Sequence, residues 1–480
     1  MLESIQSDLT QCINNPDDPA KQCKLETTLT EAVKQTVTDA NFRAQTGCSP
    51  DFWRIACLAM PEFAQKPTAQ SCLVLLLKLV RNAVVNEVVN QQLAIEFGAL
   101  YEIEKIINTR LQSHDQEAIT VMQIGTQAIC NMMTGNSIAL EFVWEEWMQD
   151  INRGHVYSEL LGVNDDGVVT ATMILILNCI RNSRERCQAM VKAKPGRAML
   201  NAILDDLERL HSDEHNKNFE LGYSIISQLI DYGHFVTVYR NIEDTSEQMN
   251  GRLTMLIKVI DSKIHAYKEK SNGLPQYLGH VELKTISGLV RQLCQRAVFV
   301  MEQVIEGQAP PSALEIDDVS EVYTTLVLVL QTASTLLTTN EDGHADFKEM
   351  LSEDNVMQAV TDLLSRCETM DQNKQPGFNY LKRDSVRLLG ALCYEDRRMQ
   401  DKIREIGGIP LILAQCKIED ANPYLREYAI LAIRNILKDN PDNQALIAQM
   451  EPKEAVQTDG LSEMGLKAKL VDGKVKIEKA

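Results

Sequence analysis

The residues whose types and spacing could most directly carry out chemistry are two histidines with a glutamate between them. His211, Glu214 and His215 match the pattern His-x-x-Glu-His, in which two histidines on one helical face hold Zn²⁺ and the glutamate acts on its bound water. A polar Asn-Lys-Asn stretch follows, and no third ligand stands out, although a zinc site needs a fixed helix and further partners. We therefore expect a solvated helix end, with a zinc-dependent hydrolase as a remote alternative.

A second candidate is the acidic stretch at residues 338–349. Asn340, Asp342 and Glu349 stand where a twelve-residue calcium loop has its ligands. Thr338 occupies the first position, where an Asp should supply a charged oxygen, and no second loop exists to pair with this one. The pattern favours a turn between two helices whose acidic residues cap the second helix.

Other signatures of chemistry are missing from the sequence. The strings Gly-x-x-x-x-Gly-Lys-Ser/Thr, Gly-x-Gly-x-x-Gly and Gly-x-Ser-x-Gly do not occur, so the usual phosphate-binding and nucleophile motifs are absent. Neither Cys-x-x-Cys nor Met-x-Met spacing is present, which argues against copper. The twelve cysteines are scattered singly, and we expect reduced, buried thiols. The sequence thus predicts no enzyme, no cofactor and no metal.

Composition limits the kinds of partner. The net charge is −19, and no basic patch interrupts it that could bind nucleic acid. The longest apolar stretch, residues 72–80, is interrupted by Lys78 and is too short to span a bilayer. The N-terminus lacks the pattern of a signal peptide. We therefore expect a cytoplasmic protein with neither nucleic acid nor membrane insertion among its interactions.

Abundant helix formers with only 23 Gly and 14 Pro in 480 residues favour helices as the elements that position any site. One helical pattern recurs. Leu-Val-Arg-Asn82 and Ala-Ile-Arg-Asn435 are each followed, eight residues after the Asn, by Asn-Gln. Asn131 and Asn182 end weaker copies of this pattern. Asn131 lies 49 residues after Asn82, and Asn182 lies 51 residues after Asn131. Periods of roughly 40 to 50 residues belong to solenoids built from two or three helices per unit.

The second half of the unit is also visible. A helix ends at Gly407 and Gly408, and the next begins with Pro410 in its first turn, which is the usual asymmetry of helix ends. Phe-Gly98-Ala-Leu-Tyr has the same design with one glycine. Together these motifs resemble the armadillo repeat. More narrowly, residues of about 378–450 resemble the C-terminal domain of the ataxin-10 family, and the length suggests a fungal-type member.

The resemblance implies an all-α fold, an armadillo-like α-α superhelix or solenoid. Helix-breaking residues in the sequence divide the chain into parts. We expect the following parts: 1–65 as an N-terminal helical cap, 66–240 as armadillo-like repeats, 241–318 as a divergent helical connector, 319–450 as a C-terminal armadillo-like ataxin-10 domain, and 451–480 as a polar tail.

In a solenoid each unit buries its apolar face against its neighbours and leaves a long surface for partners. This predicts a non-enzymatic scaffold or adaptor that binds other proteins, with self-association left open. The family resemblance implies a role in cytokinesis and cell division. The alternative is a peptide-cargo adaptor in which Asn82, Asn131, Asn182 and Asn435 line a concave groove and bind an extended backbone. We favour a structural role for these asparagines, and a core position for Trp144 and Trp147.

Overall fold

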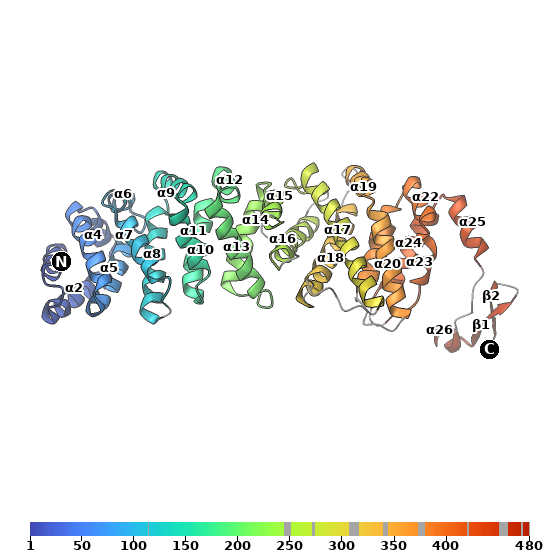
Figure 1. The fold of residues 1–480 in the computed structure, drawn as a ribbon, viewed down its shortest axis with the longest axis horizontal. Helices are drawn as coiled ribbons and strands as arrows, with labels where there is room; N and C mark the ends of the chain where they lie inside the picture. The colour runs from blue at the N-terminus through green and yellow to red at the C-terminus, as the bar shows by residue number, and fades with distance from the viewer. Residues whose placement is uncertain are drawn as a thin grey trace. The chain divides into compact units, whose positions relative to one another are not determined.

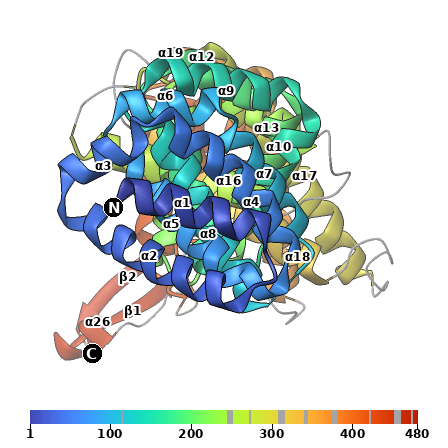
Figure 2. The ribbon, with the colours of Figure 1, turned by 90° about the vertical axis from the view of Figure 1, so that its left-hand side faces the viewer.

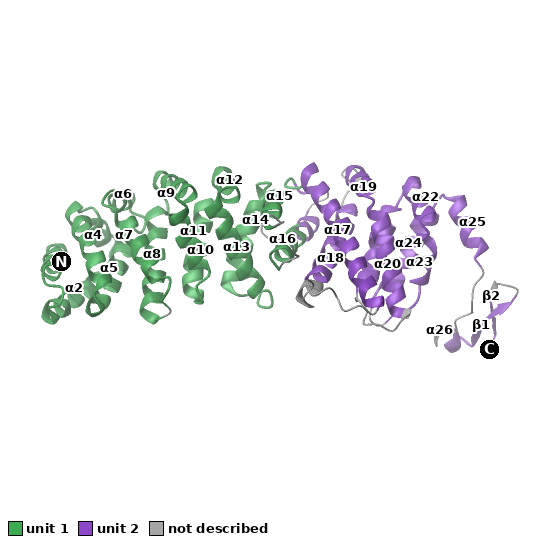
Figure 3. Ribbon diagram, viewed as in Figure 1, with its two compact units in different colours: residues 1–263, 276–279 green, residues 264–275, 280–480 purple. Residues whose placement is uncertain are grey.

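The structure, a computed structural model, describes residues 1–113, 115–243, 251–270, 274–306, 316–338, 344–372, 380–419, 422–450, 459–471 and 474–479. These residues form helices and a single two-stranded hairpin (Figure 1). They separate into two compact units (Figure 3): residues 1–263 with 276–279, and residues 264–275 with 280–480.

The elements of unit 1 are α1 (Leu2–Asn14), α2 (Pro19–Thr38), α3 (Ala40–Gly47), α4 (Pro50–Gln65), η1 (Pro67–Ala69), α5 (Gln70–Ala83), α6 (Val88–Glu96), α7 (Ala99–Arg110), α8 (Gln116–Met133), α9 (Ser137–Gln149), α10 (Ile151–Leu161), α11 (Asp166–Ile180), α12 (Arg184–Lys192), α13 (Lys194–Arg209), α14 (Lys217–Asp231) and α15 (Phe235–Glu243). Most of α16 (Gly251–Lys268) also belongs to it.

Unit 2 contains α17 (His280–Ile305), α18 (Ile316–Leu337), α19 (His344–Glu353), α20 (Val356–Gln372), α21 (Leu381–Leu392), α22 (Arg397–Glu405), α23 (Gly408–Ala414), α24 (Leu425–Leu437), α25 (Pro441–Gln449), α26 (Asp459–Glu463), β1 (Leu466–Val471) and β2 (Lys474–Lys479). The strands pair antiparallel, with Leu466 opposite Lys479. The sequence analysis did not predict this hairpin.

Unit 1 repeats a group of three helices: α3–α5, α6–α8, α9–α11 and α12–α14. Equivalent helices of successive repeats pack against each other, which produces three rows. The third helices form the row α2, α5, α8, α11 and α14, which we call the third-helix row. Figure 2 views this unit from its N-terminal end, with α1 and α2 in front. Unit 2 repeats the arrangement, with α18, α21 and α24 as its third-helix row.

Local sequence explains where the helices begin and end. Asp115, Asp165 and Asp396 accept hydrogen bonds from the first turns of α8, α11 and α22 through their carboxylates, because an N-cap side chain satisfies amides that the helix leaves open. Gly98 and Gly407 have left-handed φ angles of +83° and +75° between the first and second helices of their repeats, a conformation that glycine adopts without strain. The predicted glycine breaks are confirmed.

The core lies between the rows. Trp144 and Trp147 are 1% and 0% exposed, which confirms their predicted core position. Buried Glu104 accepts from Trp147 Nε1 at 2.7 Å and from the Tyr157 hydroxyl at 2.6 Å, and Arg153 pairs with it at 3.0 Å. This network links α7, α9 and α10, because a buried carboxylate needs several donors.

The expected all-α, armadillo-like solenoid fold is confirmed. Within the described ranges, no helix has the length and apolarity needed to cross a bilayer. The domain boundaries that we derived from sequence breakers stay predictions.

Candidate protein-binding site

One hollow lies on the third-helix row of unit 1, between α8 and α11 and beside the start of α14. Its volume is about 320 Å³. Gln123, Gln127 and Asn131 line it from α8, and Thr170 and Ile174 line it from α11. Residues four apart on a helix share a face, so the spacing of these side chains brings them to the same side. Lys217, the first residue of α14, completes the lining at one edge.

The opposite faces of the same helices fix this surface in place. On α8, Val121, Met122 and Ile129 are fully buried, and on α11 the same is true of Met173 and Ile176. Apolar burial on one face holds the polar face outward. The sequence therefore sets which side chains reach the hollow, and the packing of α8 against α11 brings the two sets together.

Most of the side chains that line the hollow are uncharged. Arg81 of α5 lies at its border, where its Nη1 donates to Gln127 Oε1 at 2.7 Å and its Nε donates to Asn82 Oδ1 at 3.1 Å. Burial lowers the pKa of the Arg81 guanidinium. Amide and hydroxyl groups beside one aliphatic side chain can pair with the backbone of another protein while covering an apolar residue.

The asparagines of the predicted row mainly join adjacent repeats. Asn131 Nδ2 donates to the Arg81 carbonyl at 3.1 Å, and Asn435 Nδ2 donates to the Gly390 carbonyl at 3.0 Å. Asn82 Nδ2 donates to Thr36 Oγ1 at 3.0 Å. In each case the amide reaches the preceding third helix, so one of its two N–H groups is already used within the solenoid. Of the four predicted residues, Asn131 is the one that lines the hollow.

Asn182 does not share this environment. It follows the end of α11, is exposed, and has a left-handed φ of +55°. Asn178 occupies the equivalent position on the helix, and its Nδ2 lies 3.5 Å from Cys130 Sγ of the preceding third helix. Asn178, one helical turn before Asn182, therefore takes the place in this repeat that Asn131 takes in the preceding one. Asparagine tolerates the left-handed region better than most residues, which accounts for its presence in this turn.

Sequence reasoning missed two glutamines with matching roles. Gln91 Nε2 lies 3.2 Å from the Val84 carbonyl oxygen and 2.9 Å from those of Asn131 and Thr134. Gln91 is fully buried in α6. It thus satisfies the open C-terminal carbonyls of two consecutive third helices, α5 and α8.

Gln400 repeats this arrangement in unit 2. Its Nε2 lies 3.4 Å from the Cys393 carbonyl oxygen, 2.9 Å from that of Asn435 and 3.2 Å from that of Lys438. A seven-residue spacing from the helix end to the glutamine is common to both sites. The Asn90-Gln91 pair noted in the sequence carried this signal for Gln91, whereas Gln400 follows Met399 and belongs to no such pair. Only the packing of three helices shows the shared purpose of the two glutamines.

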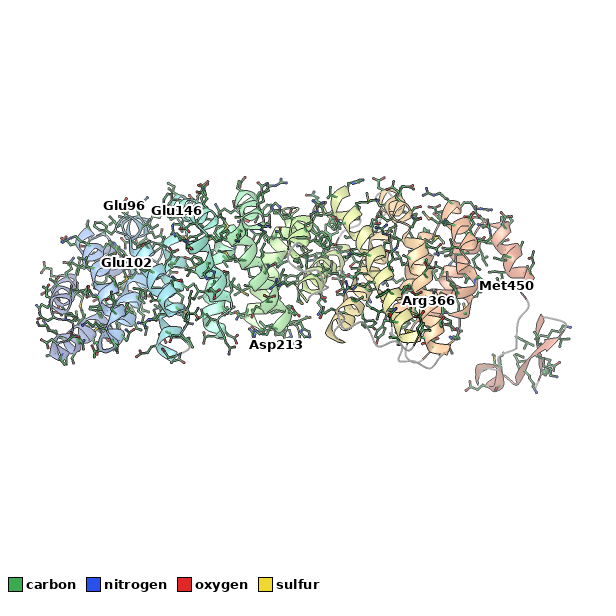
Figure 4. All side chains as sticks on the ribbon, in the orientation of Figure 1. Glu96, Glu102, Glu146, Asp213, Arg366 and Met450 are labelled. Carbon is green, nitrogen blue, oxygen red and sulfur yellow. The ribbon has the colours of Figure 1, made fainter. Side chains whose placement is uncertain are left out.

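The candidate zinc residues lie elsewhere and do not form the expected geometry. His211, Glu214 and His215 are exposed in the turn between α13 and α14, where Figure 4 labels Asp213. His211 Nδ1 lies 2.8 Å from the Glu208 carbonyl oxygen. The hypothesis of two histidines on one helical face is wrong, because the helix ends before them. The described residues contain no group of three His, Cys, Asp or Glu suited to a metal ion.

Residues 339–343 of the predicted calcium-like turn lie outside the described residues. The cysteines are free thiols. Burial raises the pKa of Cys57, Cys72 and Cys367 to about 12. Such thiols stay protonated near neutral pH and are poor nucleophiles.

Comparison with known proteins shows what this chain is similar to. The family model described as "Spinocerebellar ataxia type 10 protein domain" matches residues 381–478. The Ataxin-10 of Bos taurus is 25% identical over 401 residues, which cover 81% of this chain and 78% of the relative. The Ataxin-10 homolog of Kluyveromyces lactis is 37% identical over 127 residues, 26% of this chain and 24% of the relative.

Among solved structures, a designed armadillo repeat protein is 13% identical, with a TM-score of 0.23 over 70% of this chain and 99% of the other. The first relative matches most of the chain at low identity, and the second matches a shorter stretch at higher identity. The family model covers the part from α21 into β2. Residues 381–478 therefore resemble the ataxin-10 domain, and the chain as a whole is similar to Ataxin-10 proteins.

Proposed function

We propose that this protein is a non-enzymatic scaffold that holds other proteins on its third-helix rows, and that it acts in the cytoplasm in cytokinesis and cell division. The family and the helical-repeat fold support the scaffold part of the proposal. The cellular role comes from the resemblance to the ataxin-10 family. A fungal-type origin stays a prediction.

The observation that carries the scaffold proposal is the hollow between α8 and α11. It offers the amides of Gln123 and Gln127, the hydroxyl of Thr170 and the half-buried side chain of Ile174 on a rigid surface. Neutral donors and acceptors around an apolar centre are typical of protein interfaces, where charged residues are depleted at the core.

A charge placed at the centre of the hollow tests this proposal. Ile174→Arg should reduce capture of partner proteins from dividing cells at least tenfold, because an arginine here would displace the apolar contact. Ile138→Arg is the matched control, since Ile138 is 75% exposed on α9 of the same unit. Circular dichroism must show equal helicity for both variants. Equal capture by Ile174→Arg and the unchanged protein would contradict the proposal.

The peptide-cargo adaptor is a second candidate, favoured by the position of Asn131 in the hollow. We propose that Gln123 and Asn131 together would contact the peptide backbone, while Asn82 and Asn435 join repeats. The Gln123→Ala and Asn131→Ala variants should then lose binding to a library of unstructured peptides. Asn182→Ala serves as control because Asn182 is exposed in a turn. Unchanged peptide binding by both hollow variants would eliminate this candidate.

The cellular role needs a separate experiment. Proximity labelling with the full chain in synchronised dividing cells should enrich proteins of the division machinery over interphase cells. Ile174→Arg should lose part of this set. Partners unrelated to division would leave the scaffold proposal standing and overturn the proposed role in cytokinesis.

A further inference from the structure

The last third helix exposes a position that is buried in the other repeats. Ile430 of α24 is 51% exposed. Ile430 lies five residues before Asn435. Leu77, Met173 and Val386 occupy the equivalent position in their own repeats, and each is 0% exposed. These equivalents are buried because the next repeat packs over them. Ile430 has the same apolar character without that cover.

Neighbouring positions show the same difference. Ile447 of α25 is half-buried, whereas its equivalents Ala94 and Ile403 are 0% exposed. Ile433 and Leu437 of α24 are also half-buried. We call Ile430, Ile433, Leu437 and Ile447 the end face. A solenoid must cover its terminal apolar surface with a polar cap or another segment.

The chain continues beyond this face without another repeat. Met450 marks the point where it leaves α25 (Figure 4), and the next strand, β1, begins at Leu466. The hairpin has two unlike sides. Ala468 pairs opposite Ile477, and Leu470 lies two residues along the same strand, so these three side chains share one side. Leu470 and Ile477 are 39% and 60% exposed.

The other side of the hairpin carries most of its charge, although Lys479 lies opposite Leu466 on the apolar side and Val471 lies opposite Lys474 on the charged side. It carries Lys467 opposite Glu478 and Lys469 opposite Lys476, and Lys469 forms an ion pair with Glu478. An isolated two-stranded hairpin is marginally stable in water and needs a helix or further strands against its apolar side. Among the described residues, the apolar side of the hairpin and the end face are therefore two incompletely covered apolar surfaces of the same unit.

We propose that the apolar side of the hairpin packs on the end face of the same chain and caps the C-terminal end of the solenoid, with its lysine side toward solvent. With α26 kept helical, the segment from Met450 to Leu466 can still span about 40 Å, which exceeds the length of about 20 Å expected for a helix like α24. The family match runs from α21 into β2, so the end face and its cap belong to one domain.

Hydrogen exchange on the full chain, followed by mass spectrometry, tests this proposal. In the unchanged protein, amides of residues 466–479 should exchange at least tenfold more slowly than in an unfolded chain. Ile430→Lys on the end face should remove this protection. Ile477→Lys on the hairpin should in turn speed exchange in α24 and α25, because coupling between two packed surfaces is mutual.

Matched controls separate docking from general effects of charge. Lys476→Gln changes the charged side of the hairpin, and Val281→Lys adds a lysine at an exposed valine of α17. Neither should change hairpin protection. The hairpin amides of the double variant Ile430→Lys with Ile477→Lys should be no less protected from exchange than those of either single variant. Hairpin amides that exchange at the unfolded rate in the unchanged protein would overturn the proposal. Protection lost on hundredfold dilution would also overturn it, because the occupant would then be another chain.

Discussion

At the scale of single residues, buried amides hold the repeats together. Gln91 and Gln400 each satisfy carbonyls at the ends of two third helices, and Asn131 and Asn435 each reach the preceding helix. A helix end leaves its last carbonyls without internal partners, so a stack of helices needs such side chains. Gln91, Asn131 and Asn435 belong to motifs visible in the sequence, whereas Gln400 does not, and none of these motifs reveals the role of its residue.

Replacing one of these glutamines should lower stability without changing the fold. Gln400→Ala leaves buried carbonyls of α21 and α24 without their donor, so we expect the free energy of unfolding to fall by about 1–3 kcal/mol. Urea unfolding followed by circular dichroism measures this value. Gln449→Ala is the control because Gln449 is exposed near the end of α25. An equal loss in both variants would contradict the assigned role.

Thiol reactivity should divide the cysteines by burial. Burial raises the pKa of Cys187 to about 11 and that of Cys367 to about 12, so these thiols should remain protonated and unlabelled in a folded protein at pH 8. Cys23 and Cys48 are exposed and should account for the fast phase with a disulfide reagent. The double variant Cys23→Ser with Cys48→Ser should lose that phase. A fast phase that persists would show that the core opens.

At the scale of elements, close approach between third helices sets the spacing of the repeats. A Cβ added at Gly390 would lie 2.8 Å from Ala432 Cβ and 2.9 Å from Ala432 Cα, so α21 and α24 meet through two of the smallest side chains. The amide of Asn435 reaches the Gly390 carbonyl at the same place. The size of residue 390 therefore controls both the apolar contact and the hydrogen bond.

The same substitution at two helical glycines of unit 2 should have opposite effects. Gly390→Ala forces the backbones of α21 and α24 apart and should cost about 1–3 kcal/mol in unfolding free energy. Gly288→Ala on α17 meets no atom within 4 Å and should gain about 0.5–1 kcal/mol from the better helix former. Thermal and urea unfolding compare the two. Equal effects would show that the close approach does not limit packing.

At the scale of the whole molecule, the chain consists of two compact units. Stability in a repeat array is close to a sum over repeats and their interfaces, so a single cooperative transition is not expected for a chain of this length. The three tryptophans, Trp53, Trp144 and Trp147, all belong to unit 1. Tryptophan fluorescence thus reports one unit, whereas circular dichroism reports both.

Urea unfolding should therefore differ between the two methods. We expect the fluorescence midpoint and the circular dichroism midpoint not to coincide. Gly390→Ala should shift the circular dichroism curve and leave the fluorescence curve unchanged, because residue 390 lies in unit 2. Coincident curves that move together in the variant would show instead that the units unfold as one.

The amino-acid sequence by itself determined the helical class, the repeat and the resemblance to ataxin-10 proteins, since these depend on local properties: apolar periodicity, helix caps, and glycines such as Gly98 and Gly407. It also singled out Asn131, which lines the hollow; a binding role for it stays a prediction. Only the tertiary structure decided that Asn182 lies in a turn, that His211 and His215 do not share a helix, and that Gln91 and Gln400 join repeats. These features depend on which chain ends meet in space, and contacts between helices some forty residues apart leave no local pattern to read.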